Sequence, residues 1–444
     1  MAGYGPPGNV RTPWGNADQL RERMLRPGPG MPREEVAKNQ RERLFGAMVA
    51  AVATKGYEDT TVADVLELSG VSRSAFYEHF RDKEECFLAT FEGIAEQGMT
   101  LVKDELANGH GEDNGSWEGR ARQALRRALE TIVNEEAAAR LCFDGIYTAG
   151  EPGRKALERV LEEFEAVVGE TVTNCHGEEL PRQMVHGLLG GAQMVIQVQL
   201  RRDVDELPAL GDDLLEWALD YRPAPVKLRL AGRRPRPDND SHPPPFVAYS
   251  QAERIIRALA ACAKERGYPA VTIAEIAARA SISQATFYSH FDDKDHALMA
   301  ALDSAAAQML GVVMPASRRA PDWPNSVRAA IGAVCAFGAA EPELACLAAV
   351  ESFAAGPLVV NDRDRTLETI RDLMKPGLDL APRTKPLVVD AVIGAVWGLV
   401  YHTICNDGPR ALPEVAPLAT YMALAPFVGA DQAAEVANGD GRGI

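Results

Sequence analysis

A segment of ten residues occurs twice in this chain of 444 residues. Val71–Phe80 (VSRSAFYEHF) returns in outline as Ile282–Phe291 (ISQATFYSHF), at a constant offset of 211. Across the longer stretches Gly56–Lys83 and Gly267–Lys294, 11 of 28 positions are identical without a gap, whereas unrelated segments would share roughly two. A module doubled within one chain is either a tandem reader of a linear target or a fused dimer.

Each copy has the pattern of three short helices. Apolar residues at helical spacing come first, and this pattern stops at a basic residue followed by Gly56 or Gly267, a typical helix end. A second helix, a tight connection and a third helix follow, which together predict a helix-turn-helix head. The expected caps of the second and third helices are Thr61 and Ser72 in the first copy and Thr272 and Ser283 in the second.

The whole chain is predicted to be all-α and to contain two such units. Each unit would join a three-helix head to a helical regulatory domain, because weak repetition and helical patterns continue behind both heads. Between the units the sequence is rich in proline and basic residues, as in a semi-rigid linker. The predicted order is a disordered tail at 1–32, a head at 33–98, a regulatory domain at 99–221, the linker at 222–247, a head at 248–309, a regulatory domain at 310–430 and a disordered tail at 431–444.

The charge of the chain needs to be considered by region. A net charge of −16 argues against a nucleic-acid partner, because DNA binding depends on Lys and Arg at phosphates. However, Arg222–Arg236 carries several basic residues and no acid between positions 222 and 236, while 158–179 and 203–220 are densely acidic. The overall charge therefore does not exclude a basic DNA-binding surface.

Cysteine usage and hydropathy predict a cytoplasmic protein. Seven Cys occur without a CxxC pair, which favours free thiols in a reducing compartment. No signal peptide is evident at the start of the sequence. The most apolar stretch, Leu387–Ile404, contains Asp390 and His402 and is expected to be a buried helix rather than a membrane span.

The stretch Thr61–Lys83, with FYEHFRDK at 76–83, resembles the tetracycline-repressor (TetR) family of transcription regulators. The pattern FYxHFxxK after a Ser-capped turn carries the resemblance, which covers roughly Lys38–Gly98 and Tyr249–Met309. It implies a double-stranded DNA operator and a small-molecule effector as partners. It also implies a dimer interface of four helices, formed within one chain as a pseudo-dimer or between two chains as a homodimer. The candidate interface helices are Arg182–Leu200, Leu207–Tyr221, Pro386–Ile404 and Pro413–Phe427.

The start of the third helix is the part that such heads present to base edges in the major groove. In the first copy these residues are Arg73, Ser74 and Ala75, and Arg can pair with guanine. The second copy has Gln284, Ala285 and Thr286 there, which favour adenine and the thymine methyl group. We therefore expect the two heads to read different half-sites, although a solvated surface Arg is the simpler alternative for Arg73.

Other matching positions would contact the DNA backbone. Hydroxyl, imidazole and ammonium groups at helix ends all suit phosphate oxygens. These predicted residues are Thr61, Ser72, Tyr77, His79 and Lys83 in the first head and Thr272, Ser283, Tyr288, His290 and Lys294 in the second. The second head is expected to be the weaker one, because Asp292 replaces Arg81.

Function in the regulatory domains is less clearly marked. Aromatic or polar residues amid apolar helices could line a ligand cavity, although a role in the core is the simpler alternative for each. They are Phe143, Tyr147, Gln193, Phe337, Trp397 and Tyr401. No catalytic motif or metal-ligand spacing occurs, so neither an enzyme nor a cofactor is expected. The prediction is a DNA-binding regulator, in most cases a repressor relieved by a small apolar ligand. The alternative is a ligand-binding or assembly protein whose heads no longer bind DNA.

Overall fold

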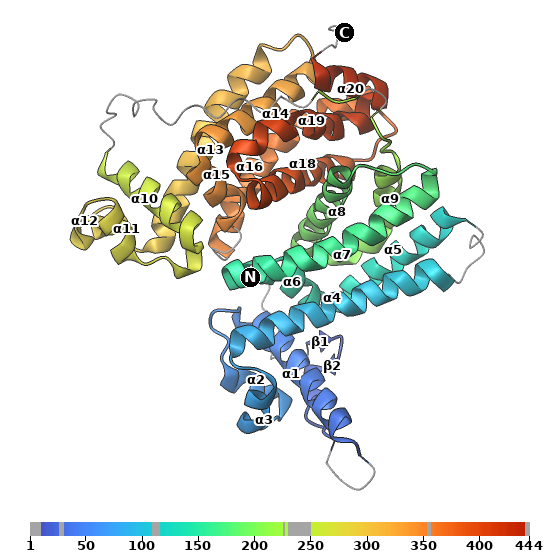
Figure 1. The fold of residues 1–444 in the computed structure, drawn as a ribbon, viewed down its shortest axis with the longest axis vertical. Coiled ribbons are helices and arrows are strands. Elements are labelled where there is room, and N and C mark those ends of the chain that lie inside the picture. The colour runs from blue at the N-terminus through green and yellow to red at the C-terminus, as the bar shows by residue number, and fades with distance from the viewer. Residues whose placement is uncertain are drawn as a thin grey trace. The chain divides into compact units, whose positions relative to one another are not determined.

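A computed structural model describes residues 10–25, 31–108, 116–224, 227–229, 250–352 and 357–439. As predicted, the fold is all-α: within those ranges the only strands are β1 (Arg11–Thr12) and β2 (Gly15–Asn16), which pair antiparallel. The chain forms two compact units (Figure 1). The first comprises residues 1–175 and 196–215, and the second 176–195 and 216–444. These units are interleaved in the sequence, whereas the predicted domains are consecutive.

The first unit contains the first head, α1 to α3, and the helices that follow it. Its helices are η2 (Ala17–Gln19), α1 (Arg33–Lys55), α2 (Val62–Ser69), α3 (Arg73–His79), α4 (Lys83–Asn108), α5 (Trp117–Asn134), α6 (Glu136–Phe143), η3 (Gly145–Ala149), α7 (Gly150–His176) and η4 (Val204–Leu210). Helices α8 (Arg182–Arg202) and α9 (Gly211–Leu219) each contribute residues to both units. Because α4 runs through position 98, the head and the helices behind it share one continuous element.

The second unit contains the second head, α10 to α12. Its helices are α10 (Gln251–Arg266), η5 (Tyr268–Ala270), α11 (Ile273–Arg279), α12 (Gln284–Tyr288), α13 (Lys294–Arg318), α14 (Trp323–Ala340), α15 (Pro342–Ala349), α16 (Pro357–Met374), α17 (Pro376–Leu380), α18 (Leu387–Asn406), η7 (Pro409–Ala411), α19 (Leu412–Val428) and α20 (Ala430–Asn438). Leu344 and Leu347 of α15 belong to the same apolar core as the second head. That head is therefore packed directly on its own regulatory helices.

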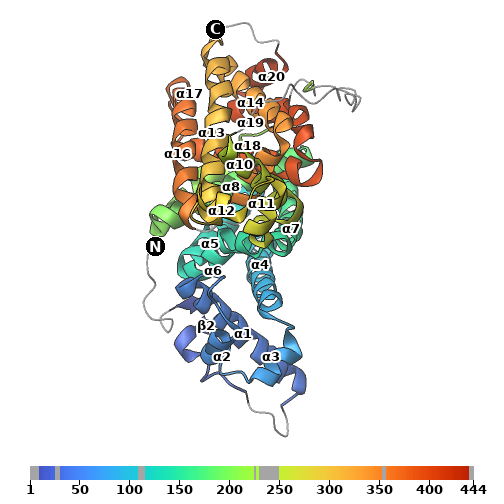
Figure 2. The same ribbon diagram turned by 90° about the vertical axis from the view of Figure 1, so that its left-hand side faces the viewer.

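The N-terminal segment differs from the prediction. A disordered tail was expected at 1–32, yet residues 10–25 form the hairpin β1–β2 and η2, which Figures 1 and 2 show beside α1. Trp14 and Leu20 are buried, and the Trp14 ring lies 5.1 Å from that of Phe45 on α1. The Gly- and Pro-rich composition around this segment hid its four buried apolar residues, Val10, Trp14, Ala17 and Leu20. The prediction is wrong for residues 10–25, and 1–9 and 26–30 lie outside the described residues.

The C-terminal prediction needs a similar correction. A disordered tail was expected from 431, but α20 extends to Asn438 and buries Ala433 and Ala434 completely. Small alanine side chains let α20 pack closely on α19, and such a weak apolar signal is easily read as a polar tail. Of the predicted linker, residues 225–226 and 230–247 lie outside the described residues, as do most of its Arg residues.

Within the second unit, α8 crosses α18 at glycines. A Cβ atom built on Gly190 would lie 2.6 Å from the carbonyl oxygen of Gly394, and one on Gly394 would lie 2.5 Å from that of Gly190. These two glycines are 204 positions apart in the sequence, and the same offset relates the flanking contacts. A Cβ on Gly191 would meet the Ala391 carbonyl at 2.6 Å, and one on Gly187 would meet the Ala395 carbonyl at 3.6 Å. The packing is therefore reciprocal, as at a twofold interface.

Two buried tyrosines extend this reciprocity. The Tyr221 hydroxyl donates to the Met422 carbonyl at 2.7 Å, and the Tyr421 hydroxyl donates to the Arg222 carbonyl at 2.9 Å. Both rings are fully buried, and exchanging 221 with 421 and 222 with 422 turns one bond into the other. Burial raises the pKa of both phenols above their usual range, so both remain neutral donors.

Next to the glycine crossing, the imidazole rings of His186 on α8 and His402 on α18 stack with their centroids 3.9 Å apart. Burial, the neighbouring His402 and Arg182 lower the pKa of His186 to about 4. The His186 ring is therefore held neutral at physiological pH.

By length and apolarity alone, three helical stretches of the described chain could cross a membrane: α13, α18 and 409–428, with α14 and α15, bent by 114°, as a fourth if taken together. For α18, 67% of the most apolar window is buried inside the structure, against 44% for 409–428 and 28% for α13. The high burial of α18 agrees with its prediction as a buried helix.

Candidate nucleic-acid interface

The third helix of the first head is held by apolar packing on one side and by a cap at its N-terminus. Phe76 and Phe80 are buried, and the Ser72 hydroxyl accepts a hydrogen bond from the backbone N–H of Ala75 at 3.2 Å. The preceding turn requires a left-handed residue, which Gly70 supplies with φ of 65°. Apolar packing on one side leaves the opposite side of α3 for a partner.

The second head repeats this framework at the offset of 211. Phe287 and Phe291 are buried, and Ser283 accepts from the Thr286 N–H at 3.0 Å. The left-handed turn position is Ser281, with φ of 54°, where a side chain costs about 1–2 kcal/mol relative to glycine. Helix α12 ends at Tyr288, whereas the equivalent helix α3 reaches His79. The second reading helix is therefore shorter, and the turn before it carries backbone strain at Ser281.

The residues predicted to read bases lie at the surface, with one correction. Arg73 and Ser74 are exposed in the first head, and Gln284 and Ala285 in the second. Ala75, which was expected to be exposed, is only 9% exposed, because it lies on the side of α3 that packs inward with Phe76. Its counterpart Thr286 is half-buried. The two reading surfaces therefore differ chiefly as Arg-Ser against Gln-Ala.

The tyrosines at the predicted backbone positions point away from the core. Tyr77 is 52% exposed and Tyr288 is 55% exposed, although each packs edge-on against the preceding Phe ring. An exposed phenol on this side can donate to a phosphate, and a purely structural role would not require the exposure.

Both predicted histidines are held by a glutamine that the sequence reasoning missed. His79 Nε2 lies 3.0 Å from Gln40 Oε1 on α1, and His290 Nε2 lies 3.1 Å from Gln251 Oε1 on α10. Gln40 and Gln251 are themselves 211 apart, so extending the repeat upstream would have found them. Because the Gln oxygen accepts, each ring donates through Nε2 and its other nitrogen is the acceptor when the ring is neutral.

The predicted phosphate lysines have an internal role as well. The Lys83 ammonium donates to the Tyr57 and Glu58 carbonyls at 2.8 and 3.1 Å and lies 4.3 Å from the centre of the Tyr57 ring. Lys294 repeats this arrangement on the loop at Tyr268. Partial burial lowers the pKa of Lys83. Both lysines thus brace the loop between the first two helices, which reduces what they can offer to DNA.

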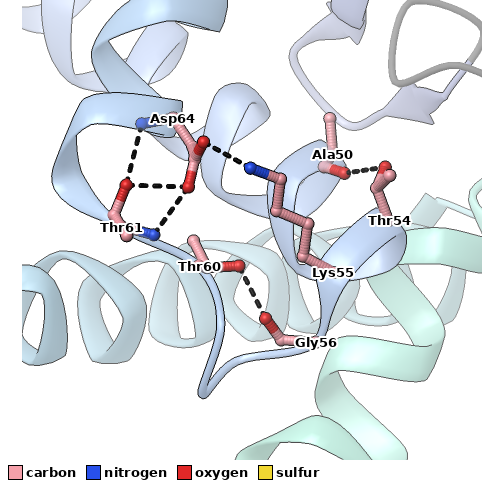
Figure 3. A network of polar contacts seen from close by, with 7 residues as sticks. All are labelled: Ala50, Thr54, Lys55, Gly56, Thr60, Thr61 and Asp64. Carbon is pink, nitrogen blue, oxygen red and sulfur yellow. Dashed lines mark hydrogen bonds and ion pairs between the residues drawn. The ribbon is translucent and has the colours of Figure 1, made fainter.

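The predicted threonines cap the second helix of each head. Thr61 and Asp64 form a reciprocal capping box, and Lys55 pairs with Asp64 at 2.6 Å (Figure 3). Thr272 and Glu275 form the same box in the second head. The Lys55 and Thr61 contacts hold the pKa of Asp64 below its usual range. The threonine hydroxyls therefore already have a structural function.

The electrostatic difference between the heads is visible at one position. Arg81 is well exposed and pairs with Glu85 at 3.1 Å, whereas its counterpart Asp292 has a side chain that is 93% exposed. An exposed carboxylate beside the reading helix repels phosphates. The weakness of the second head stays a prediction.

The residues suggested for a ligand cavity do not form one group. Phe143 on α6 and the buried Tyr147 on η3 belong to the first unit, whereas Gln193 belongs to the second. The Phe143 carbonyl accepts from Gln197 at 2.6 Å, so Gln197 is the polar partner that sequence reasoning missed. Phe337 on α14 and Trp397 and Tyr401 on α18 are half-buried. Across the described residues, no group of three or more His, Cys, Asp or Glu could hold a metal ion.

Comparison with known proteins finds similarity in the region of both heads. The family model described as "Bacterial regulatory proteins, tetR family" matches residues 47–90 and 255–302. The chain is 32% identical over 136 residues to the HTH-type transcriptional regulator CymR of Pseudomonas putida, covering 30% of this chain and 64% of that relative. It is 30% identical over 109 residues to the HTH-type transcriptional regulator TtgR, also of Pseudomonas putida, covering 24% and 50%, and 36% identical over 89 residues to the HTH-type transcriptional repressor AcnR of Corynebacterium diphtheriae, covering 18% and 46%.

The chain thus matches between about half and two thirds of the length of these relatives. A solved structure of the transcriptional regulator FadR from Bacillus subtilis in complex with stearoyl-CoA aligns with 40% of this chain and 96% of that chain, at 16% identity and a TM-score of 0.35.

Proposed function

We propose that this chain, whose two heads match the model of the tetR family of bacterial regulatory proteins, regulates transcription by binding one DNA operator through two unlike heads. The observation that carries the proposal is the pair of capped third helices, with matching frameworks and different exposed residues at their starts. Arg73 and Ser74 stand where Gln284 and Ala285 stand in the second head. Matching frameworks with different reading residues favour an operator of two unlike halves.

Selection of duplexes from random sequence by the full-length chain tests this directly. The selected site should be an imperfect palindrome, and Arg73→Ala should relax base preference in one half, at a cost of about 1–3 kcal/mol. Gln284→Ala should relax the other half. Glu78→Ala is a control on the same helix that should leave base preference unchanged. A symmetric site that loses preference equally in both halves after Arg73→Ala would refute the idea of differentiated heads.

Repression relieved by a small apolar ligand is the regulatory mode that we propose. The half-buried aromatic residues Phe337, Trp397 and Tyr401, which lie among apolar helices, suit an apolar rather than a charged effector. A reporter gene placed behind the selected operator tests the sign, since a repressor should lower expression when the chain is present. Higher expression would make the protein an activator.

We further propose that the glycine crossing and the two tyrosine bonds replace the dimer interface within one chain. The reciprocal contacts of α8 with α18 support this, because an interface built from matching halves needs no second chain. Mass measurement at low micromolar concentration separates this pseudo-dimer from a homodimer. A DNA-binding species near 47.9 kDa supports the proposal, and an obligate species of twice that mass rejects it.

The rival function is that of a ligand-binding or assembly protein whose heads no longer bind DNA. The net charge of −16 and the exposed Asp292 favour it. Salt dependence decides between the two, because each phosphate contact contributes about 0.9 to the slope of log affinity against log salt. Absence of any selected duplex together with a flat salt response would support the rival.

A further inference from the structure

The hairpin segment, residues 10–25, packs on the first head. It is anchored by Trp14 and Leu20 and tied to α1 by Asn39, whose side chain accepts from the Leu25 N–H at 3.3 Å and donates to the Arg23 carbonyl at 3.0 Å. At the offset of 211, Asn39 corresponds to Ser250, which instead caps the start of α10. The second head therefore lacks the anchoring point.

Two glycines in the first head make room for the hairpin segment. A Cβ on Gly46 of α1 would lie 2.9 Å from Leu20 and 3.1 Å from Thr12, and one on Gly93 of α4 would lie 3.2 Å from Trp14. Glycine inside a helix costs about 1 kcal/mol relative to alanine, so two of them facing one segment indicate that close approach is required. The second head has Arg257 and Ser304 at these positions, and their side chains would obstruct such packing.

The hairpin segment ends at the turn of the helix-turn-helix. Arg21 Nε donates to the Glu67 carbonyl at 2.7 Å, and its Nη2 bonds to the same oxygen. The Arg21 side chain also lies against Gly70, since a Cβ there would be 3.0 Å from Arg21 Cγ. Gly70 precedes the cap residue Ser72 by only two positions. Arg21 is thus fixed beside the start of the reading helix.

Arg21 differs from the other arginine at this turn. Arg43 donates to the Ser69 carbonyl at 2.8 Å, is buried, and has a counterpart in Arg254 of the second head. Arg21 is exposed, and the residue at the offset of 211 is Gly232. A guanidinium has five N–H donors, and the bonds to Glu67 use two of them. Arg21 therefore keeps donors and a full positive charge at the surface where a helix-turn-helix meets the DNA backbone.

We propose that the hairpin segment is a DNA-binding element of the first head, in which Arg21 contacts a backbone phosphate. This rests on the proposed DNA binding of the chain. The segment fixes the guanidinium in advance through Glu67, so little side-chain freedom is lost on binding. The first head gains one phosphate contact that carries no base information.

Salt titration of the full-length chain tests the proposal, with a duplex selected from random sequence and a scrambled duplex as probes. Arg21→Ala should weaken binding to both duplexes by a similar factor and lower the salt slope by about 0.9. The deficit should then grow roughly eightfold for each tenfold reduction in salt. Arg21→Lys should keep most of the slope, because it keeps the charge. Met24→Ala, an exposed neutral change on the same segment, should alter neither.

The outcomes distinguish a failure of the proposed DNA binding from a failure of the proposed Arg21 contact. If the wild-type chain binds neither duplex, the proposed function fails. If it binds and Arg21→Ala leaves the salt slope unchanged, Arg21 only caps α2 and the inference is overturned, whatever happens to affinity. A thermal melt of each variant accompanies the titration, so that a fall in affinity from unfolding, which Arg21→Lys would not rescue, is recognised.

Discussion

Placing a methyl group at the glycine crossing gives a quantitative test of the packing between α8 and α18. In Gly190→Ala the new Cβ would lie 2.6 Å from the Gly394 carbonyl oxygen and 2.9 Å from the Gly398 Cα. Both neighbours are backbone atoms of another helix, so no side chain can move aside and the helices must separate. Overpacking of this kind costs about 1–3 kcal/mol.

The helix propensity of alanine opposes this cost and has to be subtracted. Gly332→Ala on α14 is a matched control, because a Cβ there meets nothing within 4 Å. It should stabilise the chain by about 0.5–1 kcal/mol. The difference between the two variants isolates the overlap and should be about 1–3 kcal/mol.

Urea unfolding followed by circular dichroism measures both variants, and hydrogen exchange of α8 and α18 locates the effect. Gly394→Ala probes the same contact from the opposite helix, since its Cβ would lie 2.5 Å from the Gly190 carbonyl. The double variant should lose less than the sum of the single losses, because helices already separated accommodate the second methyl group. Gly190→Ala as stable as Gly332→Ala, or strict additivity of the pair, would refute the packing described here.

Three further predictions concern the turn, the tyrosines and the histidine pair. Ser281→Gly should raise the stability of the second head by about 1 kcal/mol. Gly70→Ser should lower that of the first by at least as much, because its Cβ would also lie 3.0 Å from Arg21 Cγ; urea midpoints measure both changes, and two changes of the same sign would contradict the strained turn. Tyr221→Phe should cost about 1–2 kcal/mol, because it strands the buried Met422 carbonyl. Tyr421→Phe should cost less, about 1 kcal/mol, because its bond to the Arg222 carbonyl is only partly buried, and a neutral result for either would contradict its bond. The pKa of His186 is lowered from 6.5 to about 4, so the contribution of this neutral ring to the free energy of unfolding is fully present above pH 6.5 and is lost as the pH falls toward 4. His186→Phe should therefore make the free energy of unfolding less dependent on pH between 6.5 and 4. An unchanged pH dependence would show that other groups cause it.

Much of each head could be predicted from the sequence because its determinants are local. Ser72 and Ser283 are caps whose partners lie three residues away, and Phe76 and Phe287 follow from helical spacing alone. The same reasoning failed for Ala75. Helix α3 has only seven residues, and its third residue already faces the core together with Phe76, which the sequence alone does not reveal.

The hairpin segment and the glycine crossing depend on contacts between distant parts of the chain. Gly46 and Gly93 were visible as glycines inside helical patterns, yet nothing nearby in the sequence says that Trp14 and Leu20 fill the space above them. Tyr221 and Tyr421 are 200 positions apart, the crossing glycines 204 and the heads 211. Because the offset between the two copies changes along the chain, an alignment without gaps does not match these residues. Their correspondence becomes clear only from the packing.

The reciprocal tyrosine bonds have a consequence for gene dosage. Both partners in each bond belong to the same polypeptide, so dilution cannot separate them by mass action. For a regulator assembled from two chains, the concentration of the dimer falls with the square of the chain concentration when copies are few. The amount of this chain that carries both bonds is instead proportional to the amount synthesised, so a cell with few copies and a cell with many hold the same fraction in the paired state.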